Sequence, residues 1–389
     1  MPKNTKKKLS KQSPKSEKTK NKKTRIVCVG SNEAQEAECL FSKLMHLKIV
    51  RYIVIFTLIV LAFPIILFLI WRPKPADHVN WGVTFSDIYS EELGLDWQDT
   101  YIKILDDLGV KHLRLVAYWK EIEPVNDQYD FSRIKWQLDE AQERDADVIL
   151  TVGRKVPRWP ECFAPKWWHD MDNQSMKRIE QYEFVERTVM ELKDYDNIKM
   201  WQVENEPFFP FGICEPITIK EVKDEVEIVR KADDYNRPIV IQDSGEGGVW
   251  FMTYNIADYL AISMYRRIWF DFWGAIFGKS IYFQYPLAHW TYKIKAHLTR
   301  VPFDKILVTE LQAEPWGPGL NSKLTQEQKD KTMSKRHFWQ TLNYAQKSGI
   351  KDIYVWGAEW WLWEKEHNDN PFFWYTAKGL FAGSAEKQK

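Results

Sequence analysis

The chain has 389 residues, 44% of them hydrophobic and 28% charged, which is ordinary for a globular protein and excludes a wholly disordered or fibrous chain. Its net charge of +1 conceals an uneven distribution: residues 1–51 carry 14 Lys and Arg against 4 Asp and Glu, whereas residues 72–389 carry 41 against 50. An acidic main body is a poor partner for nucleic acid, so we expect no nucleic-acid partner.

The chain begins with a basic segment. Residues 1–25 are rich in Lys, Ser and Thr and nearly free of apolar residues, so they cannot bury enough surface to become ordered. We therefore predict that residues 1–48 form a basic cytoplasmic tail that is mostly disordered.

A transmembrane helix is predicted over residues 49–71. Residues 52–71 contain no charged side chain, and at 1.5 Å per residue they cover about 30 Å, the thickness of a bilayer core. The alternative is a cleaved signal peptide, but Arg72 and the prolines after it stand where a small-residue cleavage site should be. We predict a single-pass signal-anchor in the lipid bilayer, with the N-terminus cytoplasmic, a linker at residues 72–77 and the main domain extracytoplasmic.

Residues 78–389 contain eight short apolar strands that alternate with amphipathic helical stretches. This rhythm predicts one (β/α)8 TIM barrel, an α/β fold. A doubly wound open sheet is the alternative, but no Gly-rich phosphate loop follows the first strand. The predicted strands are 80–85, 112–116, 147–152, 200–203, 238–242, 259–264, 305–309 and 352–356, and the clearest helices are 97–108, 134–144, 181–192, 219–232 and 329–347.

Active sites of such barrels lie at the carboxyl ends of the strands. The segments there supply carboxylates, amides, arginines and indoles, but no His and carboxylate set suited to a catalytic metal. We therefore expect no metal and no cofactor, and chemistry performed by side chains alone.

Two glutamates at strand ends indicate the reaction. Glu206 follows the fourth strand and Glu310 ends the seventh, and in a closed eight-strand barrel these strands face each other across the mouth. A pair of facing carboxylates can cleave a glycosidic bond, with retention at a separation of about 5–5.5 Å and inversion at about 6.5–9.5 Å. Glu314 is a second carboxylate near Glu310, and we prefer Glu310 because it ends the apolar strand directly.

These motifs resemble a known clan. The Asn205-Glu206-Pro207 motif after the fourth strand, with a Glu after the seventh, is similar to the retaining glycoside hydrolases of clan A, which include families 5, 39 and 42. Ser263 stands where the pattern of family 5 has a histidine, two residues before Tyr265, so the resemblance selects the clan and not one family.

The resemblance implies a role for each matching residue. Glu206 would be the acid/base and Glu310 the nucleophile, held ionised by Arg114 and Tyr265. Asn205 would bind the sugar 2-hydroxyl, and Trp356 would form the floor of the sugar site. Further aromatic residues on the rim could be sugar platforms or packing residues; the candidates for substrate binding are Trp119 and Trp159.

Two other features follow from the predicted topology. Cys162 and Cys214 lie in the loops after neighbouring strands three and four, so they could form a disulfide outside the membrane. The aromatic stretch 268–298 is either an ordinary sixth helix with a long lead-in, or a hydrophobic lid or a surface that touches the bilayer.

The sequence thus predicts a membrane-anchored retaining glycosidase that acts on β-linked oligo- or polysaccharides. Transglycosylation at the same site and a non-catalytic carbohydrate-binding barrel are the alternatives. No feature of the sequence requires an obligate protein partner.

Overall fold

The computed structural model describes residues 38–39, 41–43, 48–71, 73–270 and 281–385. The chain divides into two compact units, Met1–Ile66 and Leu67–Lys389. Most of the predicted basic tail lies outside the described residues, as does residue Arg72 of the predicted linker.

Helix α2, Lys48–Trp71, contains the predicted membrane segment. Its part Lys48–Leu67 has a mean hydropathy of 2.6, and none of that part is buried within the structure. A helix of 24 residues measures about 36 Å at 1.5 Å per residue. By length and composition, α2 can therefore cross a bilayer.

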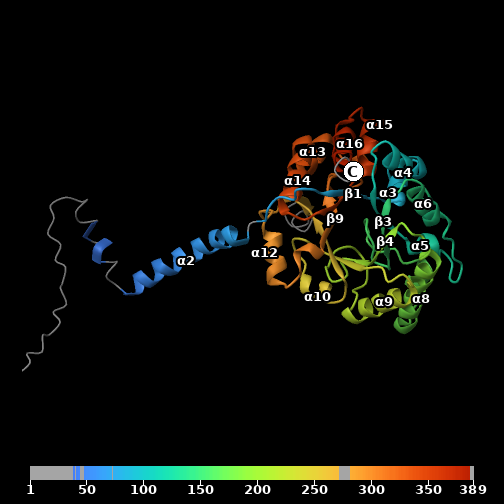
Figure 1. The fold of residues 1–389 in the computed structure, drawn as a ribbon, viewed down its shortest axis with the longest axis horizontal. Helices are drawn as coiled ribbons and strands as arrows, with labels where there is room; N and C mark the ends of the chain where they lie inside the picture. The colour runs from blue at the N-terminus through green and yellow to red at the C-terminus, as the bar shows by residue number, and fades with distance from the viewer. Residues whose placement is uncertain (1–37, 40, 44–47, 72, 271–280, 386–389) are drawn as a thin grey trace, which may run out of the picture. The chain divides into compact units, whose positions relative to one another are not determined.

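The second unit is built around eight parallel strands that close into a barrel (Figure 1). Closure is complete because β1 pairs with β2 on one side and with β10 on the other. The predicted (β/α)8 fold is confirmed. The barrel strands are β1 (Asn80–Thr84), β2 (His112–Val116), β3 (Asp147–Val152), β4 (Ile198–Asn205), β5 (Ile239–Asp243), β6 (Tyr259–Met264), β9 (Ile306–Gln312) and β10 (Asp352–Trp356).

Two strands extend further than predicted, and both contain irregularities near their carboxyl ends. In β4 the register with β5 shifts between Gln202 and Asn205, and in the β6–β9 pair it shifts between Ile262 and Ser263. Such bulges turn side chains out of the regular alternation and are common at barrel rims. They lie next to the two glutamates that the sequence singled out.

Helices surround the barrel (Figure 1). Helix α9 shows the local reasons for one of them: Thr218 and Glu221 form a capping box, and Val222, Val226 and Val229 bury one face. The described helices of this unit are α3 (Asp87–Glu92), α4 (Trp97–Asp106), α5 (Trp119–Ile122), α6 (Ser132–Glu143), α7 (Lys166–His169), α8 (Gln174–Leu192), α9 (Ile219–Ala232), α10 (Trp250–Tyr254), α12 (Thr291–Leu298), α13 (Gln326–Met333), α14 (Lys335–Ser348), α15 (Ala358–His367) and α16 (Phe372–Ala385).

The helix predicted over residues 329–347 is wrong as a single element. The structure divides this stretch into α13 and α14 at Ser334, whose backbone is extended with φ −75° and ψ 166°. The Ser334 hydroxyl accepts a hydrogen bond from the backbone N–H of His337 and so caps α14. A good N-cap residue therefore interrupts an otherwise continuous helical pattern.

Apolar side chains fill the part of the barrel interior that lies away from the carboxyl ends of the strands. The small cluster of Ile149, Val240, Ala261, Leu307 and Tyr354 draws one residue from each of five strands. Further toward the carboxyl ends, the interior positions become polar and buried. This polar layer includes Arg114, Gln202, Gln242 and Thr309, and it supports the rim above it.

The segment between β6 and β9 begins with a hairpin. Strands β7 (Arg267–Phe270) and β8 (Ile281–Gln284) pair antiparallel, and α12 follows them. Residues 271–280 of the aromatic stretch lie outside the described residues. The stretch thus contains both a helix and a long lead-in, and the lid hypothesis stays a prediction.

Candidate active site

Glu206 and Glu310 are both buried at the carboxyl ends of their strands, with 5% and 3% of their surfaces exposed. Glu206 directly follows β4 in a left-handed conformation with φ 45°, one residue after the bulge. Glu310 lies within β9, opposite Ser263 of β6 and just after the register shift. The irregular backbone, and not simple strand alternation, therefore sets the direction of both carboxylates.

Two donors hold the Glu310 carboxylate. Arg114 of β2 contacts its Oε1 atom with Nη1 at 3.0 Å, and the Tyr265 hydroxyl donates to Oε2 at 3.2 Å. The arginine is fully buried, so this charge-assisted hydrogen bond is shielded from water. The arrangement stabilises a negative charge on Glu310, as a nucleophilic carboxylate requires.

Arg114 also orients the amide of Asn205. Its Nη2 donates to Asn205 Oδ1 at 2.7 Å, and its Nε donates to Gln202 Oε1 at 2.8 Å. The Asn205 oxygen is occupied, and the buried Nδ2 atom has no hydrogen-bond partner among the described residues. Asn205 is thereby prepared to donate a hydrogen bond to a substrate oxygen.

Glu206 has a different environment. Burial, and then the negative charge of Glu310, raise the pKa of Glu206 to about 8, while a hydrogen bond from the Ser263 hydroxyl to Oε1 at 2.6 Å acts in the opposite direction. A carboxyl group with this pKa is protonated at neutral pH and can donate a proton. The two glutamates thus have different environments: Glu310 accepts hydrogen bonds from Arg114 and Tyr265, whereas Glu206 is buried beside it with a raised pKa.

Sequence reasoning missed a third carboxylate, Glu161, in the loop after β3. It is 6% exposed, and burial together with the charges of Glu206 and Glu310 raises its pKa well above the ordinary value. Lys155 of the same loop lies 3.9 Å from Glu161 Oε2 and donates to the backbone oxygens of Glu206 and Phe209 at 2.7 and 2.8 Å. The only signal in the sequence was the position of Glu161 directly before Cys162.

The other candidate nucleophile, Glu314, belongs to a separate ion-pair cluster. Arg158 pairs with Glu314 at 2.5 Å and with Glu359 at 3.2 Å. The Trp356 indole donates to Glu314 Oε1 at 2.8 Å, and the Arg158 guanidinium lies 4.0 Å from the Trp356 ring. Trp356 is 6% exposed, so most of its predicted sugar-facing surface is covered in this structure.

The two remaining tryptophan candidates have opposite environments. Trp119 is fully buried; its ring stacks on Phe184 at 4.9 Å, and its N–H donates to Glu123 at 2.7 Å. This packing corrects the suggestion that Trp119 is a sugar platform, because no face of its ring is available. Trp159 is 64% exposed and lies 5.9 Å from Phe211, which makes it available for stacking.

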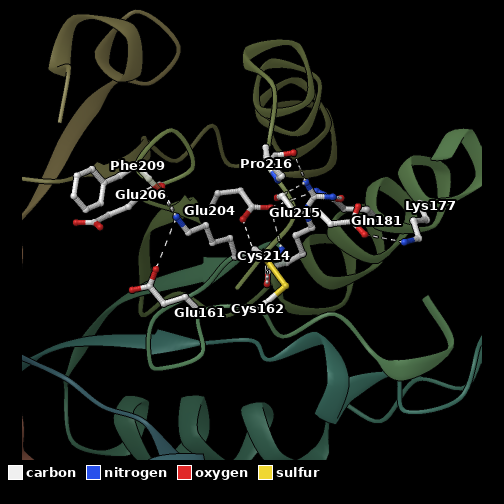
Figure 2. Close-up of a disulfide and its surroundings, with 12 residues drawn as sticks. Glu161, Cys162, Lys177, Gln181, Glu204, Glu206, Phe209, Cys214, Glu215 and Pro216 are labelled. Carbon is white, nitrogen blue, oxygen red and sulfur yellow. Dashed lines mark hydrogen bonds and ion pairs between the residues drawn. A yellow bond between two sulfur atoms is a disulfide. The ribbon is translucent and has the colours of Figure 1, made fainter. Parts of the chain in front are cut away.

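A disulfide joins the loops after β3 and β4. Figure 2 shows the bond between Cys162 and Cys214, whose Cα atoms are 4.8 Å apart. Next to it, Glu204 accepts hydrogen bonds from the backbone N–H groups of Arg154 and Lys155 at 3.0 and 2.7 Å. Two connections, one covalent and one polar, therefore hold the loop of Glu161 against the strand of Glu206.

The barrel belongs to a known protein family. Residues 80–372 match the family model described as Cellulase (glycosyl hydrolase family 5). The chain belongs to glycosyl hydrolase family 5. It is thus an O-glycosyl hydrolase of clan A, as the resemblance implied, and Ser263 is compatible with family 5.

Solved structures share the fold at low sequence identity. The GH5_18 protein of Streptomyces cattleya in complex with GlcNAc is 15% identical, covers 72% of this chain and 70% of its own, and has a TM-score of 0.50. The E140A variant of the GH5_18 protein of Bifidobacterium longum subsp. longum, in complex with Manb1-4GlcNAc, is 13% identical, covers 72% of this chain and 68% of its own, and has a TM-score of 0.50. Among curated protein sequences, none gives a significant match.

Proposed function

We propose that this family 5 hydrolase cleaves β-linked glycans with retention, by double displacement. Protonated Glu206 gives its proton to the leaving oxygen while Glu310 attacks the anomeric carbon, forming a covalent glycosyl-enzyme and releasing the leaving group. Water then gives a proton to Glu206, attacks the same carbon and releases Glu310. The observation that carries the proposal is the contrast between Glu310, held by two donors, and Glu206, with a pKa of about 8.

The neighbouring side chains serve the same transition state. Asn205 donates its unpaired amide N–H to the sugar 2-hydroxyl, and such a contact strengthens as charge develops on the sugar. Arg114 fixes that amide and the nucleophile at the same time. Tyr265 holds the second oxygen of Glu310, and the exposed ring of Trp159 is the aromatic contact for a sugar ring, whereas Arg158 covers Trp356.

Replacing the two glutamates tests their roles. We expect Glu310→Gln to abolish hydrolysis, and a 2-deoxy-2-fluoro glycoside to label Glu310 in the wild type, as mass spectrometry of peptides would show. Glu206→Ala should lower activity on natural glycans by about 10²–10⁴ but spare the first step for activated aryl glycosides. Added azide should then restore turnover and form a β-glycosyl azide.

The matched control is Glu314→Gln, because Glu314 is equally near in the sequence but pairs with Arg158 and Trp356. It should retain the label on Glu310. Labelling of Glu314 instead, or an α-configured azide product, would contradict the assignment. The substrate panel should contain β-glucosides, β-mannosides, β-xylosides and the disaccharide Manβ1-4GlcNAc, which the Bifidobacterium longum protein binds.

We propose further that α2 anchors the enzyme in the cell membrane, with the N-terminus cytoplasmic and the catalytic domain outside. The length and hydropathy of α2 support the anchor, and a disulfide in the catalytic domain suits an oxidising compartment. The full chain should remain in membranes at alkaline pH, and protease added to intact spheroplasts should digest the barrel. A barrel protected from protease until lysis would refute the orientation.

A further inference from the structure

The loop after β3 presents two side chains of different chemistry. Trp159 exposes 64% of its surface, whereas Glu161, two residues later, exposes only 6%. The disulfide at Cys162 and the hydrogen bonds of Glu204 fix this loop against the strand that carries Glu206. Figure 2 shows the Glu161 and Glu206 side chains on the same side of the disulfide.

The contacts of Glu161 do not satisfy its carboxylate. Its Oε2 atom is buried and has no hydrogen-bond partner among the described residues. Lys155 lies 3.9 Å from this atom, and it already donates to two backbone oxygens at 2.7 and 2.8 Å. A buried acceptor without a donor is costly, so it is suited to hydrogen-bond donors that arrive with a substrate.

Aromatic rings connect this loop to the catalytic centre. Trp159 contacts Phe211 at 5.9 Å between ring centroids, Phe211 contacts Trp316 at 5.6 Å, and Trp316 contacts Tyr265 at 4.9 Å. These residues come from the loops after β3, β4, β9 and β6. The row therefore runs along the mouth of the barrel from the donor of Glu310 to an exposed indole.

We propose that Glu161 and Trp159 form the binding site for the leaving-group sugar. Trp159 stacks on the ring of that sugar, and the Glu161 carboxyl group forms hydrogen bonds with its hydroxyl groups. This inference rests on the proposed function and deepens it: the preferred substrate carries a sugar, and not an apolar aglycone, on the leaving side.

The position of the loop identifies the side of the scissile bond. The acid/base protonates the leaving oxygen, so the leaving group lies beside the Glu206 carboxyl group. Lys155 links Glu161 to the backbone oxygen of Glu206, and Phe211, which touches Trp159, lies in the loop that follows Glu206. Both side chains thus belong to the Glu206 side of the site.

Two substrates with the same glycone test the inference. One is a β-linked disaccharide and the other is the nitrophenyl β-glycoside of its non-reducing sugar. Full-length enzyme in detergent should be assayed at a pH where kcat/KM of every variant does not depend on pH. We expect Glu161→Gln and Trp159→Ala to lower kcat/KM for the disaccharide at least tenfold more than for the nitrophenyl glycoside, mainly through KM.

The control is Trp339→Ala, which removes a similarly exposed tryptophan from α14 and should change both substrates equally little. Equal losses on both substrates would overturn the inference. Glu161 would then only influence the ionisation of Glu206 and would not contact the leaving-group sugar. No loss on either substrate would also overturn it. Calorimetry can measure binding of the disaccharide to Glu310→Gln and to the double variant Glu310→Gln/Glu161→Gln, and this separates the two proposals. If binding depends on Glu161 but the wild type does not hydrolyse the disaccharide, only the hydrolytic mechanism is refuted.

Discussion

The Ser263 hydroxyl donates to Glu206 Oε1 at 2.6 Å, while the backbone of Ser263 lies opposite Glu310 in the register of β6 and β9. One residue thus contacts the proposed acid/base, Glu206, through its side chain and the strand of the proposed nucleophile, Glu310, through its main chain. Ser263 stands where the pattern of family 5 has a histidine. A serine cannot carry a positive charge, so it adjusts the pKa of Glu206 by hydrogen bonding alone.

Removing this hydroxyl should raise the pKa of Glu206 further. The hydrogen bond from Ser263 favours the ionised carboxylate, and burial and the charge of Glu310 oppose ionisation. In Ser263→Ala, the basic limb of the kcat/KM profile should therefore move above its wild-type position near pH 8, by about one pH unit for a lost charge-assisted hydrogen bond. Measuring kcat/KM for an aryl glycoside between pH 5 and 10 checks this.

The matched control is Ser348→Ala, which removes another buried hydroxyl that bonds only to backbone groups at the end of α14. Its basic limb should coincide with that of the wild type. A basic limb that moves to lower pH in Ser263→Ala would mean that the serine acts on Glu206 in some other way.

Glu206 should also make the fold less stable at high pH. Its pKa is about 8 in the folded chain against an ordinary value of 4.5, so between these values the folded state holds a proton that the unfolded chain has lost. The free energy of unfolding therefore falls as pH rises through this window, by on the order of 4 kcal/mol at most. In Glu206→Gln the side chain cannot ionise, so this fall in the free energy of unfolding is absent.

Thermal unfolding at pH 5 and pH 8.5 tests this linkage. The Tm of Glu206→Gln should exceed that of the wild type by a larger margin at the higher pH. Glu121→Gln, at an exposed rim position, should show the same small difference at both values. An equal difference in Tm for Glu206→Gln at both pH values would mean that the higher Tm does not come from ionisation of Glu206.

The barrel could be predicted because the alternation of short apolar strands with amphipathic helices is a local pattern in the sequence. Four strands, β2, β3, β6 and β10, have the predicted bounds, since each is a short and mostly apolar run. The directions of Glu206 and Glu310 could not be predicted, because each depends on a bulge whose register is set by a partner strand. The sequence predicted both residues as catalytic candidates, but not the backbone conformation that sets the direction of their side chains.

The errors in the site have a common physical origin in contacts between distant residues, unlike the helix break at Ser334, which is local. Trp119 is buried because Phe184 of α8 stacks on it, and no periodicity near Trp119 reveals that contact. Glu161 belongs to the site because the disulfide and Glu204 bring its loop to Glu206. The pairing of Cys162 with Cys214 contained this information, since it placed the two loops side by side.

Arg114 should be irreplaceable by lysine. Three of its nitrogens contact three different residues, Glu310, Asn205 and Gln202, and a lysine ammonium cannot reproduce that planar fork. We expect Arg114→Lys to lower kcat by about 10²–10³, comparable with the loss of a preorganised transition-state contact. Arg144→Lys, a partly exposed arginine paired with Asp106 and Glu140, is the control and should retain activity. If Arg114→Lys has the kcat of the wild type, the three guanidinium contacts are not required for catalysis.

Loss of the disulfide should weaken both the fold and the active site. Cys162 and Cys214 are 52 residues apart, and closing a loop of this length stabilises the folded chain by about 4 kcal/mol in the chain-entropy model. We expect the double variant Cys162→Ser/Cys214→Ser to lose about this much in urea unfolding. Its KM should also rise more for a disaccharide than for an aryl glycoside, because the released loop carries Trp159 and Glu161.

A background variant with serine at Cys28 and Cys39 isolates this bond. Reduction under denaturing conditions should reveal two additional thiols in that background, and it should reproduce the stability loss of the double variant. Equal thiol counts before and after reduction would refute the bond. A stability loss without the difference in KM would show that the bond stabilises the barrel but does not position the loop after β3. The comparison thus separates the energetic contribution of the disulfide from its effect on the active site.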